Sequence, residues 1–288
     1  MKLALGTVQF GLPYGVSNHT GQTPLLEAAR IVELARSSGI SVLDTAMVYG
    51  DSEARLGKIG VESFKVVTKL PTLPESCPNP KKWVEEQVEG SLQRLGQERL
   101  YGLLLHNPTQ VLSAKGNQLF EVLQAFKTRG LVEKIGISIY SPSELDELLP
   151  LFPFDIVQSP FNPVDRSLIA SGWMQKLHAE GIEIHVRSVF LQGLLLMPAD
   201  QIPTKFSRWS PLWKNWHDWL SQNGISPQAA CLAFAKSFSE VDQILVGVET
   251  RLQLEEILRA FDSPTRDSFP SIEATDPDLI NPSQWSKL

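Results

Sequence analysis

Ser41-Val42-Leu43-Asp44-Thr45-Ala46-Met47-Val48-Tyr49-Gly50 is the stretch that decides the fold of this chain. It begins as a short apolar run and then places a carboxylate, Asp44, five residues before a phenol, Tyr49. Two later runs have the same form, Lys65-Val66-Val67-Thr68-Lys69 and Leu103-Leu104-Leu105-His106. Continuous apolar runs of this length are typical of strands that are buried on both faces in a parallel sheet. We therefore expect the ionisable residue that closes each run to lie at the tip of a strand.

Eight segments of the chain have the character of buried strands, and most gaps between them have the periodicity of an amphipathic helix. For the helix after the first strand, Thr23 is predicted as the N-cap and Pro24 as the first residue, and Gly39 ends it. The last helix begins with Thr250 and Gln253, the pattern of a capping box. The predicted strands cover residues 3–8, 41–46, 65–70, 102–106, 133–138, 154–159, 183–189 and 243–247.

Strands that alternate with helices of this length imply parallel pairing, and eight such units in 288 residues imply a closed barrel. We therefore predict an α/β protein, a (β/α)8 TIM barrel, with residues 1–288 in a single domain. Residues 262–288 are rich in Pro, Ser and Asp and are expected to form a C-terminal tail over the barrel. A doubly wound open sheet is the alternative, but no GxGxxG follows the first strand.

The composition is that of an ordinary globular protein, with 42% hydrophobic and 20% charged residues. A net charge of −6, with no run of Lys or Arg, argues against binding to nucleic acid or to an anionic membrane surface. No apolar stretch is long enough to span a membrane, and Gly6 precedes any stretch that could serve as a signal peptide. Cys77 and Cys231 are isolated, which favours reduced thiols in a cytoplasmic protein without a metal site.

Polar side chains stand at or just after most of the predicted strand ends, where barrels of this type hold their catalytic residues. Reduction of a carbonyl by hydride needs a proton donor beside the oxygen. A phenol, with a pKa of about 10, is a weak acid until a neighbouring ammonium favours its ionised form. We expect Lys69 to supply this charge to Tyr49, Asp44 to hold and neutralise Lys69, and His106 to orient the carbonyl oxygen.

Each of these four residues also has a structural explanation when it is taken singly. Asp44 could cap a loop, Tyr49 could be a half-buried aromatic, Lys69 could be a solvated strand end, and His106 could be a hydrogen-bonded core residue. Together, titratable groups gathered in one cleft favour catalysis. Two alternatives remain, a cofactor-binding regulatory or interaction protein with little turnover, and a lyase or isomerase that uses Lys69 as a Schiff base.

The chain resembles the aldo-keto reductases over nearly its whole length. The residues that carry this resemblance are Asp44-Thr45-Ala46-x-x-Tyr49-Gly50-x-Ser52-Glu53, Val67-Thr68-Lys69, Leu104-Leu105-His106 and Gly136-Ile137-Ser138. Members of that family are NADP-dependent carbonyl reductases on a (β/α)8 barrel. The resemblance implies reduction of an aldehyde, ketone or keto-sugar by NADPH, with Tyr49 as the general acid.

The resemblance also implies which residues hold the cofactor. Ser138 and Gln158 would bind the nicotinamide carboxamide, the segment from Arg187 to Gly193 the pyrophosphate, and Glu256 the adenine. The start of the last helix would face the adenosine, since helix N-termini suit phosphate. The cofactor-binding residues expected are Gly6, Thr7, Asp44, Ser138, Gln158, Arg187, Ser188, Leu191, Gly193, Gly247, Val248, Glu249, Gln253 and Glu256.

Three features depart from the family's pattern. Ile139 stands where many members have an Asn beside the carboxamide, and Arg187 stands where many have an aromatic residue on the nicotinamide ring. Around the expected adenosine 2′-phosphate, Glu249 and Gln253 occupy places where members that prefer NADPH usually have Lys, Arg or Ser. Only Arg251 is basic there, and this charge pattern predicts that the protein can also use NADH.

Candidate substrate contacts follow from position alone. Met47, Val48 and Asn107 would flank the carbonyl in a barrel. Four Trp residues lie at helical spacing within residues 209–219, which is more often a stripe that packs a helix onto the core. Trp209, nearest the preceding loop, is the candidate among them for a substrate contact. The identity of the substrate and the oligomeric state stay open.

Overall fold

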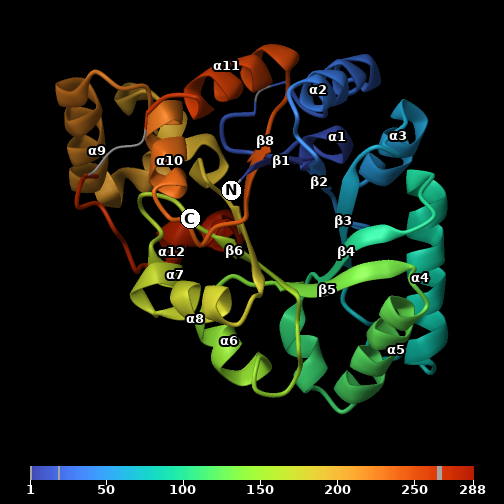
Figure 1. The fold of residues 1–288 in the computed structure, drawn as a ribbon. Helices are drawn as coiled ribbons and strands as arrows, with labels where there is room; N and C mark the ends of the chain where they lie inside the picture. The colour runs from blue at the N-terminus through green and yellow to red at the C-terminus, as the bar shows by residue number, and fades with distance from the viewer. Residues whose placement is uncertain (1, 19, 265–267) are drawn as a thin grey trace.

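The computed structural model describes residues 2–18, 20–264 and 268–288, which form one closed barrel of eight parallel strands (Figure 1). Each strand pairs with the next in chain order, and the last pairs with the first. The predicted (β/α)8 barrel is therefore confirmed. The strands are β1 (Lys2–Gly6), β2 (Val42–Asp44), β3 (Lys65–Leu70), β4 (Leu100–Leu105), β5 (Val132–Ser138), β6 (Ile156–Pro160), β7 (Glu183–Arg187) and β8 (Gln243–Gly247).

Helices cover the outside of the barrel between successive strands (Figure 1). The α-helices are α1 (Val8–Gly11), α2 (Leu25–Ser37), α3 (Ser52–Ile59), α4 (Pro80–Leu95), α5 (Gly116–Thr128), α6 (Ser143–Leu148), α7 (Ser167–Ala170), α8 (Trp173–Ala179), α9 (Ser210–Asn223), α10 (Pro227–Lys236), α11 (Arg251–Phe261) and α12 (Pro277–Ile280). The 3-10 helices are η1 (Pro108–Leu112), η2 (Leu191–Leu196), η3 (Ala199–Gln201), η4 (Thr204–Trp209) and η5 (Pro282–Lys287).

The first strand is shorter than its sequence predicts. β1 ends at Gly6, and its predicted extension to residue 8 is wrong, because the backbone turns at Thr7 to begin α1. The N–H and the hydroxyl of Thr7 both donate to the carbonyl oxygen of Asp44, at 2.9 and 3.0 Å. This pair of hydrogen bonds joins the carboxyl ends of β1 and β2, at the end of the barrel where the candidate catalytic residues lie.

The capping predictions have mixed outcomes. Pro24 is the N-cap of α2 and Leu25 is its first residue, so the predictions of Thr23 as the N-cap and of Pro24 as the first residue are both wrong. The Thr23 hydroxyl donates to the carbonyl oxygen of Glu249 at 3.3 Å, and it therefore links α2 to the loop after β8. The capping box of Thr250 and Gln253 at the start of α11 is confirmed.

The interior of the barrel is narrow and is filled by short or branched apolar side chains. Two strand glycines make room for them, Gly102 on β4 and Gly136 on β5. A Cβ atom on Gly136 would lie 2.4 Å from the carbonyl oxygen of Ile156 and 2.5 Å from Cδ2 of Leu104. The interior apolar layer consists of Ala4, Val42, Val67, Leu104, Ile156 and Leu245.

Gly136→Ala is expected to lower the free energy of unfolding by about 1–3 kcal/mol, because the added methyl group overpacks the barrel interior. The matched control is Gly6→Ala, since a Cβ on Gly6 would meet no atom closer than 3.6 Å. Urea unfolding of the two variants measures the difference. Equal stability of Gly136→Ala and the native protein would contradict the tight packing around β5.

The C-terminal tail packs against one side of the barrel, beside the loop that follows β6. The N–H of Ala274 donates to the carbonyl oxygen of Val164 at 2.9 Å. The buried ring of Trp285 meets Phe206 with ring centroids 4.8 Å apart. No described residue of the tail lines the cavity at the strand ends.

The tryptophan stripe of α9 packs onto the core, as the commoner interpretation of such stripes predicts. Trp213 and Trp216 are buried. Their indole N–H groups donate to the carbonyl oxygens of Phe206 and Leu195, both at 3.0 Å. These two side chains therefore hold α9 against η2 and η4.

Two properties of the chain bear on its surroundings. No helix in the described ranges is long and apolar enough to cross a bilayer. Cys77 and Cys231 are both buried free thiols, and burial raises the pKa of Cys231. The Cys231 thiol therefore stays protonated at neutral pH.

Candidate active site

A cavity of about 480 Å³ opens at the carboxyl ends of the strands. Strand ends and the loops after them line it, among them Asp44, His106, Ser138, Gln158 and Arg187. In (β/α)8 barrels, active sites form at this end, where the strands have their carboxyl termini. The cavity also falls within the volume range that small-molecule and cofactor sites usually have.

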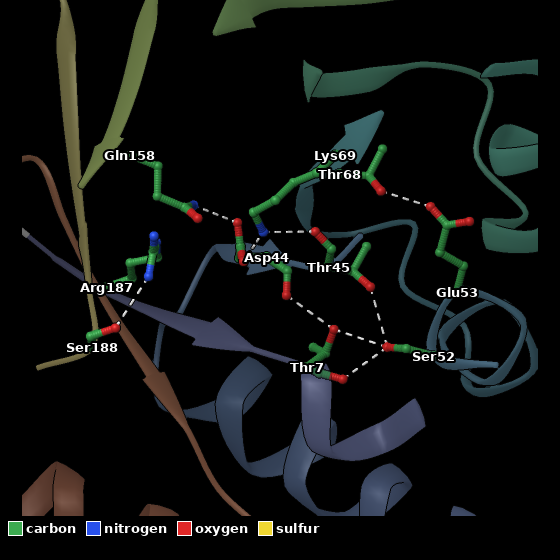
Figure 2. A network of polar contacts seen from close by, with 10 residues as sticks. All are labelled: Thr7, Asp44, Thr45, Ser52, Glu53, Thr68, Lys69, Gln158, Arg187 and Ser188. Carbon is green, nitrogen blue, oxygen red and sulfur yellow. Dashed lines mark hydrogen bonds and ion pairs between the residues drawn. The ribbon is translucent and has the colours of Figure 1, made fainter. Parts of the chain in front are cut away.

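A buried ion pair stands at the end of the cavity where β2, β3 and β6 meet. Nζ of Lys69 donates to Oδ1 of Asp44 at 2.6 Å and to the carbonyl oxygen of Thr45 at 2.9 Å. Nε2 of Gln158 donates to the second carboxylate oxygen, Oδ2, at 2.7 Å. Figure 2 shows Lys69 and Gln158 reaching Asp44 from different strands, so that both carboxylate oxygens are engaged.

The ion pair keeps Lys69 charged although the side chain is only 1% exposed. Burial is the largest single influence and lowers the pKa of Lys69, but attraction to Asp44 and Tyr49 together with the hydrogen bond to Asp44 outweighs it, and the net shift of the pKa is upward. The ammonium is therefore a permanent positive charge at neutral pH. Its Nζ lies 5.2 Å from the centre of the Tyr49 ring.

Tyr49 is placed beside this charge by a tight turn between β2 and α3. The N–H of Tyr49 donates to the carbonyl oxygen of Ala46 at 3.0 Å, and the N–H of Met47 donates to that of Lys69 at 3.2 Å. Gly50 follows with φ +53°, and a Cβ atom there would lie 2.4 Å from the carbonyl oxygen of Gly11. Only glycine fits this close crossing of two backbones in a left-handed conformation.

His106, just after the end of β4, is the fourth residue of the group formed by Asp44, Lys69, Tyr49 and His106. Its ring meets Tyr49 edge to face, with the ring centroids 6.0 Å apart. Burial lowers the pKa of His106 to about 4, and the positive charges of Lys69 and Arg187 add to this shift. The imidazole is therefore neutral at physiological pH and has one N–H to donate.

The lowered pKa of His106 predicts a pH dependence of stability. The unfolded chain binds the proton below a pKa of about 6.5, whereas the folded protein binds it only below about 4. The stability that the neutral ring provides is therefore fully present above pH 6.5 and is lost as the pH falls towards 4. Over this range the free energy of unfolding falls by up to about 1.4 kcal/mol per pH unit. Urea unfolding from pH 4 to 7 is expected to show a shallower slope for His106→Gln. Identical slopes for both proteins would contradict this prediction.

A second buried network lies behind the group and fixes the start of α3. Oε1 of Glu53 accepts hydrogen bonds from the hydroxyls of Thr68 at 2.7 Å and Ser91 at 2.6 Å. Its Oε2 pairs with Arg94 at 2.7 Å. Figure 2 shows the hydrogen bond from Thr68 to Glu53. Because Glu53 lies in the first turn of α3, the network holds the start of this helix, just after Tyr49, against β3 and α4.

The cavity offers partners for a nicotinamide carboxamide. Among the described residues, Oε1 of Gln158 and Oε1 of Gln9 are buried and accept no hydrogen bond. Both side chains line the cavity, and Ser138 lies beside Gln158 in the register of β5 and β6. A buried acceptor left unpaired is costly, so a ligand N–H at these positions would be favourable. The residues present therefore fit a nicotinamide cofactor.

Most of the predicted site residues lie at this cavity. Of those that do not line it, Lys69 is buried behind Asp44, and Leu191 is buried within η2. The predicted substrate contacts Met47, Val48, Asn107 and Trp209 are also absent from the lining, and Trp209 packs near Phe206. The predicted residues that line the cavity are Tyr49, His106, Gly6, Thr7, Asp44, Ser138, Gln158, Arg187, Ser188, Gly193, Gly247, Val248, Glu249, Gln253 and Glu256.

In the loop between α1 and α2, Tyr14, Gly15 and Ser17 line the cavity, and the sequence did not single them out. The N–H of Val16 donates to the carbonyl oxygen of Gln192 at 3.0 Å, and Nε2 of Gln192 donates to the Tyr14 hydroxyl at 2.9 Å. The hydroxyl of Thr20 donates to Glu249 at 3.0 Å. Loop residues carry no periodic signal, so only the folded chain brings these segments together. Tyr140 in the loop after β5 and Gln228 on α10 also line the cavity, and the sequence did not single them out either.

Comparison with known proteins agrees with the fold. Residues 2–275 match the model of the Aldo/keto reductase family. The chain belongs to the aldo/keto reductase family. Relatives include aldo-keto reductase YhdN of Bacillus subtilis, 25% identical over 58% of this chain and 52% of that protein. The 6-dehydroglucose reductase of Agrobacterium fabrum is 25% identical over 59% of this chain and 61% of that protein.

The match therefore spans only about half to three-fifths of these two relatives. Solved structures agree on the fold over more of the chain. The holo form of an aldo-keto reductase from Bacillus halodurans has a TM-score of 0.74 and 20% identity, covering 92% of this chain and 87% of that one. The glycerol dehydrogenase of Gluconobacter oxydans has a TM-score of 0.69 and 20% identity, covering 92% and 88%.

Proposed function

We propose that the protein reduces an aldehyde, ketone or keto-sugar to the alcohol with a reduced nicotinamide cofactor, and that Tyr49 is the general acid. The observation that carries the proposal is the group of Tyr49, Lys69, Asp44 and His106 at the end of one cavity. A phenol beside a permanent ammonium and a neutral imidazole is suited to deliver a proton to a developing alkoxide.

Each residue then has a defined task. A reduced nicotinamide bound in the cavity supplies the hydride. The neutral His106 donates its N–H to the carbonyl oxygen, which positions and polarises the carbonyl. Tyr49 donates its hydroxyl proton to that oxygen as negative charge develops there. Lys69 stabilises the phenolate left on Tyr49, and Asp44 holds the ammonium in place.

The two alternative functions fit the site less well. A Schiff base on Lys69 needs a neutral amine, but the Asp44 carboxylate at 2.6 Å raises the pKa of Lys69 and keeps it charged. A binding protein without turnover has no need for a proton donor beside an ammonium, yet Tyr49 is held there by its turn. Both features favour catalysis.

Loss of reduced-nicotinamide absorbance tests the proposal directly. The native protein is mixed with NADPH or NADH and with a panel of aldehydes, ketones and keto-sugars. The sugars are included because a relative is named 6-dehydroglucose reductase. We expect turnover with at least one class, and tight cofactor binding with no turnover on the whole panel would favour a binding protein instead.

The residues at the expected adenosine end of the cavity predict how well the site accepts the 2′-phosphate of NADPH. Glu249, Gln253 and Glu256 line this end, and Arg251 nearby pairs with Glu255 at 3.0 Å. NADPH is the family's usual cofactor, but the carboxylates of Glu249 and Glu256 oppose its extra phosphate, so we expect NADH to be used as well.

Glu249→Gln is expected to shift the ratio of kcat/KM for NADPH over NADH towards NADPH by about three- to tenfold, because it removes one repulsive charge from a partly exposed site. Kinetics with both cofactors measure the ratio. Glu121→Gln is the control, because Glu121 is an exposed carboxylate on α5 that does not line the cavity. Equal ratios in the native protein and in Glu249→Gln would exclude a role for Glu249 in cofactor choice.

A further inference from the structure

Arg187 is the feature of the cavity that the proposed reaction does not use. It is the last residue of β7 and lines the same cavity as Tyr49, His106 and Gln158. Its guanidinium is fixed from two sides. Nη2 donates to the carbonyl oxygen of Ile139 at 2.9 Å, and the group lies 4.6 Å from the centre of the Tyr140 ring.

In the part of the chain that the structure describes, no carboxylate forms an ion pair with Arg187. Asp44 is engaged by Lys69 and Gln158. The buried Asp165 bonds Ser167 at 2.6 Å instead, and burial raises the pKa of this carboxyl group despite the opposing effect of Arg187.

The field of this charge reaches the reacting groups. Arg187 contributes to the lowered pKa of His106, after burial and Lys69. Hydride transfer requires the nicotinamide ring to lie against the carbonyl carbon, whose oxygen would be bound by Tyr49 and His106 in the proposed reaction. A ring so placed would lie in the cavity that Arg187 also lines.

We propose that Arg187 is a specificity-determining residue that makes the site bind the reduced nicotinamide more tightly than the oxidised one. This inference rests on the proposed function. The nicotinamide ring is neutral when reduced and carries a positive charge when oxidised. An unpaired guanidinium near it repels only the oxidised form, and its face attracts a neutral π system. The site is thereby biased towards carbonyl reduction and towards release of the oxidised product.

Equilibrium binding tests this without turnover. The affinities of the native protein for NADPH and NADP⁺, and for NADH and NAD⁺, are measured by quenching of tryptophan fluorescence. We expect the reduced form of each pair to bind at least about tenfold more tightly. In Arg187→Tyr and Arg187→Met, this ratio is expected to fall by about tenfold, mainly through tighter binding of the oxidised form.

Two controls separate the possible outcomes. Arg187→Lys keeps the charge and should restore most of the ratio, which a purely structural role of the guanidinium would not do. Arg251→Gln removes a charge outside the cavity and should change both redox forms alike. If the Arg187 variants weaken both forms equally, Arg187 binds the pyrophosphate and the proposal is overturned. Failure of the native protein to bind any of the four nucleotides would overturn the proposed function itself.

Discussion

Replacing Tyr49 by Phe is expected to lower kcat for carbonyl reduction by about 10²- to 10⁴-fold, the usual contribution of a positioned general acid. The substitution removes one hydroxyl and keeps the ring that meets His106 at 6.0 Å. Affinity for the reduced cofactor should stay close to that of the native protein, because the proton is needed only during the chemical step. Steady-state kinetics together with fluorescence titration of the cofactor separate these two quantities.

Tyr101→Phe is the matched control for this variant. Tyr101 is a partly buried phenol on β4 that donates to Glu183 at 2.7 Å, and it does not line the cavity. Its loss should lower stability and leave kcat of the folded protein near the native value. Unchanged turnover in Tyr49→Phe would remove Tyr49 from its proposed role.

Replacing Lys69 by Met is expected to have the largest effect on stability. It leaves Asp44, only 4% exposed, as a buried carboxylate without its counter-charge. Breaking a buried ion pair in this way costs about 3–5 kcal/mol. The variant should also lose turnover, because nothing then stabilises the phenolate of Tyr49. Urea unfolding and the reductase assay measure the two losses.

The double variant Lys69→Met/Asp44→Asn distinguishes the structural role of Lys69 from its catalytic role. It removes both charges, so it should recover much of the lost stability, since replacing a buried pair is far less costly than breaking it. It should not recover turnover. Recovery of both properties would mean that Lys69 serves the fold alone, and a stable, active single variant would contradict the ion pair's importance altogether.

Much of the fold was predictable because its signals are local. An apolar run buried on both faces is recognisable from composition alone, and helix ends carry capping residues, as Thr250 and Gln253 do. The errors arose where a distant group competed with a local preference. Thr7 and Thr23 bond to backbone carbonyls of Asp44 and Glu249, which sequence periodicity cannot reveal.

The sequence by itself determined that eight strands alternate with helices and that Asp44, Lys69 and His106 follow apolar runs. When such a barrel closes, the carboxyl ends of all its strands lie at the same end of the barrel, and these three residues lie there too. Only the tertiary structure decided that Gln158 takes the second oxygen of Asp44 and that no carboxylate of the described residues forms an ion pair with Arg187. Those properties depend on distances between loops and strands far apart in the chain, which no local pattern encodes.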